Sequence, residues 1–325
     1  MRKSIAFALL IFALLLMVAP TAIVAKNGDK KAPKQLEARD IKIHKKLKAP
    51  LDQIDIMGKP AFTPPADEDE AYEEVSAEMT ATGILGDEVI GRKYAIVIGI
   101  CNYPGRRWDI CVADEDGMNM SEALQDVYEF DEIYSFQDLN ATRDNIYAAI
   151  NDIKNKAISA NDEVVFFYSG HGVSGVADDN DSETIDEALL VHNGKRLQYI
   201  WDGELKEWFS GYATARIAFI FDTCRAGGMN DLAADGRLLI MSALEAESAH
   251  VYDIDGVKQP EGLFSHYFVN EGILQGEASF DYGTESESRL LITLEQAYDH
   301  AIGTANVINF QTPVTNDNFE NDWLP

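Results

Sequence analysis

Two stretches of sequence decide the fold: Asp162-Glu-Val-Val-Phe-Phe-Tyr-Ser-Gly-His-Gly172 and Arg216-Ile-Ala-Phe-Ile-Phe-Asp-Thr-Cys224. Each begins with an apolar run rich in β-branched and aromatic residues, which is typical of a strand buried on both faces. Each then enters a glycine-rich turn that carries one reactive side chain, His171 or Cys224. Side chains at the carboxyl ends of parallel strands line the crevice where ligands bind. If the two strands are neighbours, His171 therefore faces Cys224.

The sequence around these stretches alternates between apolar strands and amphipathic helices. We expect further strands at 94–100, 132–136, 189–192 and 238–241, and helices at about 114–128, 202–209, 264–274 and 293–304. A further helix opens at 141–144, with Thr142 as its N-cap and Ile146, Ile150 and Ile153 on one face. This alternation predicts an α/β fold in which helices cover both faces of a mostly parallel sheet.

The residue types at the two strand ends suit covalent chemistry at a carbonyl carbon. A thiolate such as that of Cys224 is the attacking form of cysteine. An imidazole such as that of His171 raises the thiolate fraction and later protonates the leaving amine. The backbone N–H groups of Gly172 and Cys224 are the candidates for stabilising the oxyanion. We therefore predict a Cys–His dyad that hydrolyses peptide bonds.

Two other functions remain open for the same residues. A chain with this fold can serve as a silent recognition module, although the intact Cys, His and glycine set favours activity. An acyl transferase can use the same dyad to pass the acyl group to an amine instead of water. His44, His192, His250, His266 and His300 lack a glycine-rich strand-end setting, and no His or Cys pair has the spacing typical of zinc ligands.

The motifs Tyr168-Ser-Gly-His-Gly172 and Asp222-Thr-Cys224 resemble those of caspase-like cysteine peptidases, metacaspases and their prokaryotic relatives most closely. The resemblance covers residues 93 to about 315 and implies a mostly parallel sheet of about six strands. Weaker similarities are Cys111-Val-Ala-Asp114 and Leu238-Leu-Ile-Met-Ser-Ala243. This chain departs from metacaspases around the nucleophile, where Thr223 replaces a usual Ser and Arg225-Ala-Gly227 replaces His-Ser-Gly.

The resemblance also implies a substrate pocket. Metacaspases form their primary pocket from an Asp two residues before the nucleophile, a Ser two residues before the His, and an Asp in a Cys-x-x-Asp sequence. The matching residues here are Asp222, Ser169 and Asp114. Carboxylates in a narrow cleft attract a cation, and Arg binds carboxylates in bidentate fashion. We therefore expect cleavage after Arg or Lys, although Asp114 also suits a helix N-cap.

Calcium is the one possible cofactor, and the proposed chemistry itself requires none. An acidic loop at 178–187 separates the catalytic motifs, and clustered carboxylates suit calcium. Such a run is usually a solvated loop. By resemblance to calcium-dependent metacaspases, the ligands are Asp186, Asp202 and Asp231, while Gly203 stands where a further acid is expected.

The N-terminus reads as an export signal. Arg2 and Lys3 precede an apolar run that ends near Ala25, so residues 1–25 are a signal peptide or an uncleaved anchor. We expect a pro-segment or solvated linker at 26–92 and a peptidase domain at 93–325. The protein is then secreted, periplasmic or held at the cell surface. Cys101 and Cys111 are free to pair in such a compartment, which leaves Cys224 as the odd thiol.

The net charge of −28 excludes nucleic acid as a partner, because phosphates repel an acidic chain. The partners we expect are protein or peptide substrates with basic residues, and we expect a monomer. Self-processing is a further expectation, since metacaspase-like enzymes often cut themselves. The candidate cleavage sites are the basic stretch 26–48, Lys195-Arg196 and Arg237.

Overall fold

The computed structural model describes residues 54–57, 59, 78–110, 112–177, 185–252, 260–284 and 286–325. The chain divides into two compact units, Met1–Ile43 and His44–Pro325, and all described residues belong to the second. The predicted export segment, the basic stretch 26–48 and most of the acidic loop lie outside the described residues. Within the described residues, no helix combines the length and the apolar character needed to cross a membrane.

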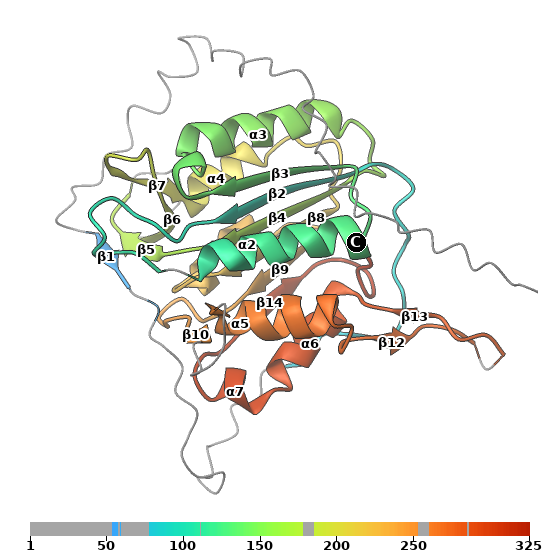
Figure 1. The fold of residues 1–325 in the computed structure, drawn as a ribbon. Helices are drawn as coiled ribbons and strands as arrows, with labels where there is room; N and C mark the ends of the chain where they lie inside the picture. The colour runs from blue at the N-terminus through green and yellow to red at the C-terminus, as the bar shows by residue number, and fades with distance from the viewer. Residues whose placement is uncertain are drawn as a thin grey trace, which may run out of the picture. The chain divides into compact units, whose positions relative to one another are not determined.

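A six-stranded sheet forms the centre of the fold, in the order β14-β9-β8-β4-β2-β3 (Figure 1). Its strands are β2 (Lys93–Gly99), β3 (Glu132–Gln137), β4 (Glu163–Ser169), β8 (Ile217–Asp222), β9 (Arg237–Met241) and β14 (Val314–Asp317). All neighbouring strands pair in parallel except β14, which runs antiparallel to β9 at one edge. The predicted α/β class and mostly parallel sheet are therefore confirmed.

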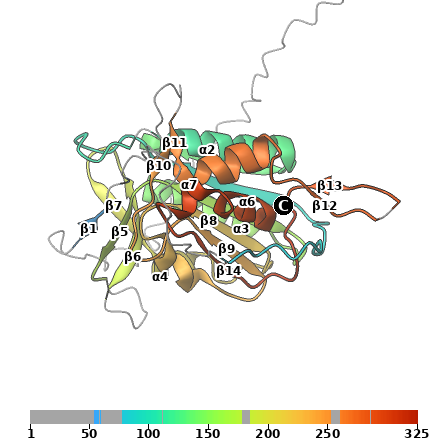
Figure 2. The ribbon, with the colours of Figure 1, turned by 90° about the horizontal axis from the view of Figure 1, so that it is seen from below.

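Helices cover both faces of this sheet (Figures 1 and 2). They are α2 (Ala113–Glu122) continued by η2 (Ala123–Val127), α3 (Arg143–Lys156), α4 (Asp202–Trp208), α5 (Leu263–Ser265) continued by η5 (His266–Leu274), and α6 (Leu294–Ile302). The sheet has one hydrophobic core on each face, and the side chains of β2 enter them alternately. Ile96 and Ile98 pack in the core with α3, whereas Ala95 and Val97 pack in the core with α2 and α6. This alternation is the two-residue repeat of an extended strand.

A smaller antiparallel sheet extends from the catalytic histidine motif. It has the order β1-β5-β6-β7, with β1 (Asp55–Ile56), β5 (Gly172–Gly175), β6 (Asp186–His192) and β7 (Leu197–Trp201). Only part of β6 was predicted from the sequence. The remaining elements are η3 (Asp138–Asn140), η4 (Ala226–Leu232), β10 (Val251–Tyr252), β11 (Glu261–Gly262), β12 (Phe280–Asp281), β13 (Leu290–Leu291) and α7 (Ala305–Ile308).

The sequence predicted some details of the helices and of the linker correctly and others incorrectly. The Thr142 side chain accepts a hydrogen bond from the Asn145 amide at 3.2 Å, so the predicted N-cap of α3 is confirmed. The predicted helix at 264–274 is instead one short α-helical turn followed by the π-helix η5. The predicted solvated linker was wrong for residues 78–92. There, the Thr80 and Ala81 amides donate to Asp299, and the Gly83 amide donates to Asp322.

A buried ion pair ties the start of β8 to the neighbouring strand β4. Arg216 Nε lies 2.6 Å from Glu163 Oε2, and the Glu163 side chain is fully buried. Trp323 donates its indole N–H to the same carboxylate oxygen at 3.0 Å. Burial raises the pKa of Glu163, and the Arg216 charge opposes that rise. The Glu163 charge would therefore cost free energy of folding if Arg216 were removed.

We expect Arg216→Met to lower the free energy of unfolding by about 3–5 kcal/mol, because it leaves the buried Glu163 without its cation. Urea unfolding followed by circular dichroism measures the change. The control is Arg92→Met, since the Arg92–Asp131 pair is 62% and 39% exposed. Its loss should cost less than about 1 kcal/mol. Equal effects of the two substitutions would contradict a structural role for the buried pair.

Candidate active site

The two reactive residues lie at the ends of adjacent parallel strands. In the β4–β8 pair, Ser169 is aligned with Asp222. His171 and Cys224 each follow two residues later and are buried. The two turns touch at Gly172, where a Cβ atom would stand 1.8 Å from the Cys224 carbonyl oxygen. Only glycine permits this approach, so the glycine of the histidine motif is required for the two motifs to meet.

Both ring nitrogens of His171 face backbone carbonyls. Nε2 lies 2.8 Å from the Trp108 oxygen, and Nδ1 lies 3.2 Å from the Met57 oxygen. A carbonyl only accepts hydrogen bonds, so the ring satisfies both contacts only when it is doubly protonated. Burial lowers the pKa of His171, while the two hydrogen bonds act in the opposite direction. With Trp108 holding Nε2–H, Nδ1 is the nitrogen left to exchange a proton with a nucleophile.

The Cys224 thiol is free, and it faces a carbonyl in this structure. Its Sγ lies 3.9 Å from the Ala249 oxygen. Burial raises the pKa of Cys224, and the nearby Lys59 charge partly opposes the rise. Cys101 is disulfide-bonded, and Cys111 lies outside the described residues. The arrangement is that of a protonated, resting thiol rather than a preformed thiolate.

The predicted oxyanion donors belong to the two turns that meet at this point. Gly172 starts β5 and lies against the Cys224 carbonyl, so the backbones of both residues are adjacent. Around them, Thr223 Oγ1 donates to the Gly170 oxygen at 3.0 Å, and the His171 amide donates to the Tyr103 hydroxyl at 3.1 Å. These bonds between side chain and backbone fix the two turns relative to each other, as a preorganised site requires.

A buried acidic pocket, formed by Asp116, Ser169 and Asp222, adjoins the dyad. Ser169 Oγ donates to Asp116 Oδ2 at 2.6 Å, and Asp222 Oδ2 accepts from the Ser265 amide and hydroxyl at 3.0 and 2.7 Å. Gly262 lies between the carboxylates, and its amide donates to Asp116 Oδ1 at 2.8 Å. Burial raises the pKa of Asp116 to about 8, and the Asp222 charge adds to the rise. The pocket therefore buries two carboxyl groups close together.

The structure places Ser169 and Asp222 together, as predicted, but it does not place Asp114 with them. Asp114 lies in the first turn of α2 and is half-buried, whereas Asp116 is fully buried on the face that contacts the sheet. Val112, not Asp114, is the N-cap of this helix. The helical repeat of the sequence could have identified Asp116 as the buried acid, because this residue shares a helix face with Ala113, Gly117 and Met120.

Lys59 of the predicted linker occupies the acidic pocket. Its Nζ lies 2.8 Å from Asp222 Oδ1 and 3.5 Å from Ser169 Oγ, and both side chains of the Lys59–Asp222 pair are fully buried. Lys59 also lowers the pKa of Asp116, against the effect of burial. No feature of the sequence near Lys59 identified it, because its partners lie more than a hundred residues away in the chain.

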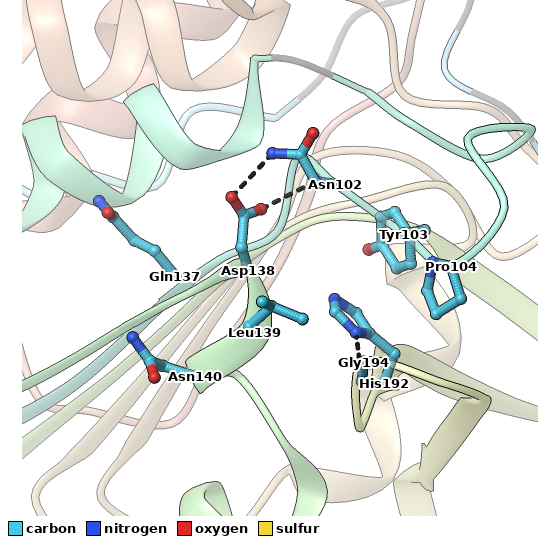
Figure 3. Close-up of a pocket in the computed structure, with 9 residues that line it drawn as sticks. All are labelled: Asn102, Tyr103, Pro104, Gln137, Asp138, Leu139, Asn140, His192 and Gly194. Atoms are coloured by element: carbon cyan, nitrogen blue, oxygen red, sulfur yellow. Dashed lines mark hydrogen bonds between the residues drawn. The ribbon is translucent and has the colours of Figure 1, made fainter.

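A separate hollow lies on the other side of Tyr103 (Figure 3). It has a volume of about 510 Å³ and is lined by Asn102, Tyr103, Pro104, Gln137, Asp138, Leu139, Asn140, His192 and Gly194. The Tyr103 ring packs against both His171 and His192, with ring centroids 5.0 and 5.6 Å apart. None of the dyad or acidic-pocket residues lines this hollow.

The predicted calcium ligands come from three elements that pack together: Asp186 from β6, Asp202 from α4 and Asp231 from η4. Asp186 and Asp202 are buried, and Asp186 Oδ2 accepts a hydrogen bond from the Ala177 amide at 2.8 Å. Asp231 pairs with Lys206 at 3.3 Å. Glu187, which was not predicted, is also buried and approaches Gly228 of η4.

The other histidines within the described residues have structural contacts. His192 Nδ1 accepts from the Gly194 amide, and His266 contacts Glu261 and Glu271. His300 lies beside Glu271 and Glu277, and one donor atom from each lies within 4.8 Å of the others. This group could hold a cation, and the sequence did not identify it because its members come from η5, the following loop and α6.

Comparison with known proteins gives one family. Residues 93–233 match the model described as metacaspase, peptidase C14 domain. Metacaspase-1 of Sclerotinia sclerotiorum is 31% identical over 207 residues, covering 60% of this chain and 43% of that protein. Metacaspase-1B of Neurospora crassa is 31% identical over 204 residues, covering 59% and 43%. Metacaspase-1 of Pyricularia oryzae is 31% identical over 155 residues, covering 44% and 38%. The chain thus spans less than half the length of each of these relatives.

Proposed function

Because this chain belongs to the caspase-like metacaspase family of cysteine peptidases, we propose that it is an endopeptidase that cleaves after Arg or Lys. Cys224 is the nucleophile and His171 is its acid–base partner. The acidic pocket binds the basic side chain that precedes the scissile bond. The site residues supply each of these roles within one connected group of strand ends and turns.

The mechanism follows from the geometry of the dyad. The Trp108 carbonyl holds the Nε2–H of His171, which fixes the tautomer and leaves Nδ1 free to accept the thiol proton. The Cys224 sulfur then attacks the carbonyl carbon, and the backbone N–H groups of Gly172 and Cys224 stabilise the oxyanion. His171 returns the proton to the leaving amine, and water hydrolyses the acyl-enzyme.

The observation that carries the basic preference is the position of Lys59. An ammonium group lies 2.8 Å from the Asp222 carboxylate in a fully buried environment. Two adjacent carboxylates repel each other, so a cation between them offsets their mutual repulsion and the cost of burying them. An acidic side chain would add a third negative group to the same pocket. The pocket is therefore suited to Lys or Arg and excludes Asp or Glu.

Export of the protein belongs to the same proposal. The apolar run at 5–24 follows two basic residues, and Cys101 is disulfide-bonded. Disulfides persist in oxidising compartments and are rare in the cytosol. A secreted or surface-held enzyme would meet protein substrates outside the cell.

The calcium part of the proposal places the ion at Asp186, Asp202 and Asp231. Calcium takes six to eight oxygen ligands and tolerates irregular geometry. Here Asp186 and Asp202 are buried carboxylates, and burying carboxylates favours a bound cation. Glu187 can supply the acid that is missing at Gly203, because it is buried on β6 next to Gly228 of η4. Bound calcium would neutralise this acidic group next to η4, the segment that follows the nucleophile.

The first test uses a panel of peptide amides. We expect hydrolysis after Arg and Lys and at least tenfold slower hydrolysis after Asp. Cys224→Ala should abolish turnover and His171→Ala should lower it by several orders of magnitude. Product mass spectra separate hydrolysis from acyl transfer to an added amine. Undiminished turnover by Cys224→Ala, or faster cleavage after Asp than after Arg, would overturn the proposal.

The second test decides which helix carboxylate binds the substrate. Asp116→Asn should lower kcat/KM for an Arg substrate about 10- to 100-fold, because the amide cannot ionise and pair with a basic side chain as the Asp116 carboxyl can. Asp114→Asn is the matched control, since it makes the same change two residues away on a half-buried face. If Asp114→Asn has the larger effect, the pocket assignment is wrong.

Self-processing is tested by mass spectrometry of the purified chain. Lys195 and Arg196 are exposed or partly exposed at the turn between β6 and β7, so we expect any internal cut there. Arg237 binds the Leu232 and Phe209 carbonyls and is a poorer site. Cuts in the basic stretch 26–48 should also appear. All of these fragments should be missing from the Cys224→Ala protein; their presence would assign the trimming to another protease.

The calcium proposal is tested by isothermal titration calorimetry and by peptidase activity at controlled free calcium. Asp202→Asn and Glu187→Gln should weaken binding, because each removes a negative donor from the buried group. The control is Asp235→Asn, an exposed acid outside the group. Full activity after chelation, together with no heat of binding, would show that the site is not functional.

A further inference from the structure

The leader segment, defined as residues 54–57 and 59, contacts β5, His171 and the acidic pocket. Asp55 and Ile56 pair with Ser174 and Val173 as the antiparallel edge strand β1. The Met57 carbonyl lies 3.2 Å from Nδ1 of His171, and the Lys59 ammonium binds Asp222. The segment therefore covers the sheet edge, the catalytic base and the substrate pocket at once.

The register of the leader segment does not match that of a bound substrate. In a productive complex, the residue whose side chain fills the pocket presents its own carbonyl to the thiol, and the imidazole lies at the next amide nitrogen. Here the carbonyl at the catalytic imidazole belongs to Met57, two residues before Lys59. The Met57 oxygen also faces the nitrogen that must accept the thiol proton. The bond after Lys59 is therefore not aligned with its proton donor.

The sequence adds a second barrier to cleavage. Pro60 follows Lys59, so the nitrogen that would leave is part of a pyrrolidine ring and carries no N–H. Between residues 60 and 91 there is no Lys or Arg. An enzyme with a basic preference therefore has no site at which to cut the leader segment from its domain before Arg92. Cuts in the stretch 26–48 leave the segment attached.

An ion pair next to the nucleophile also holds the leader segment against the active site. Arg225 directly follows Cys224 and lies 2.6 Å from the Asp55 carboxylate. Arg225 has a positive φ of 60°, a left-handed backbone conformation that is uncommon for a residue other than glycine. The Asp55 side chain is 67% exposed, so salt screens this pair, whereas the buried Lys59–Asp222 pair is largely protected from salt.

We propose that the leader segment is a built-in inhibitor that the enzyme cannot cleave, held by Lys59 in the acidic pocket and by Asp55 on Arg225. This inference rests on the proposed peptidase function and specifies its regulation. Because the segment is tethered, it competes with substrate at a high effective concentration. Substrates must displace it, so its effect falls on KM more than on kcat. Activation then requires displacement, or a cut by a peptidase of different specificity in the acidic stretch 60–77.

The main experiment compares Lys59→Gln with Lys154→Gln, a control at a partly exposed lysine that contacts the Ser210 carbonyl and the Tyr212 ring. Lys59→Gln in the full chain should lower KM for an Arg peptide amide by about tenfold or more with little change in kcat, because a tethered competitor is lost. It should also speed alkylation of Cys224 by iodoacetamide, since the cleft is then open. Lys154→Gln should change neither value. Unchanged KM and unchanged alkylation in Lys59→Gln would overturn the proposal.

A second experiment supplies the segment in trans. A peptide of residues 54–62 should inhibit the Lys59→Gln protein competitively and stay intact by mass spectrometry, while the same peptide carrying Lys59→Gln should not inhibit. Cleavage of the peptide after Lys59 would refute the resistance to cleavage. If no variant hydrolyses any substrate, the peptidase proposal fails. The alkylation rates still decide whether the segment covers Cys224.

Discussion

The parallel pairing of β4 with β8 is the constraint on which the rest of the site depends. It aligns Ser169 with Asp222, so the two pocket residues are partners in the sheet, and it sets His171 and Cys224 two residues beyond them. Gly172 then lies directly against the Cys224 carbonyl. A shift of one residue in this register would separate the dyad and turn one of the two pocket side chains to the opposite face of the sheet. The register between β4 and β8 thus fixes the positions of both the dyad and the pocket residues.

The same pairing creates an electrostatic problem that shapes the chain around it. Asp116 and Asp222 are buried on either side of Gly262, and burial together with the Asp222 charge raises the pKa of Asp116. Hydrogen bonds from Ser169, Ser265 and the Gly262 amide offset part of this cost. A cation offsets much of the rest, and Lys59 supplies it from within the chain. Under the proposed specificity, the affinity of the pocket for a basic side chain and the stability of the resting state have the same origin.

The resting state is also visible at the dyad. The Cys224 thiol faces the Ala249 carbonyl, and the Met57 carbonyl faces Nδ1 of His171. Burial raises the pKa of the thiol and lowers the pKa of the imidazole, while the two carbonyl contacts of the ring oppose the latter change. Movement of the leader segment would free Nδ1 and admit solvent and substrate together. The chemistry is held back by a neighbouring backbone group rather than by a missing residue.

The sequence by itself determined the α/β class, the buried strands, the cap of α3 and the pairing of a histidine turn with a cysteine turn. Each of these depends on short-range properties: the repeats of strands and helices, glycine at turns, and residues that share one segment with a strand end. Ser169 and Asp222 were identified through the resemblance to metacaspases, because they lie two residues before the histidine and the cysteine of the matching motifs.

Tertiary structure alone decided that Asp116 rather than Asp114 meets the pocket, because the rotation of α2 about its axis is set by packing of Ala113, Gly117 and Met120 on the sheet. It also decided that Ser265 and Lys59 complete the pocket. Contacts between residues far apart in the chain depend on how whole elements pack, and no local repeat in the sequence records that packing.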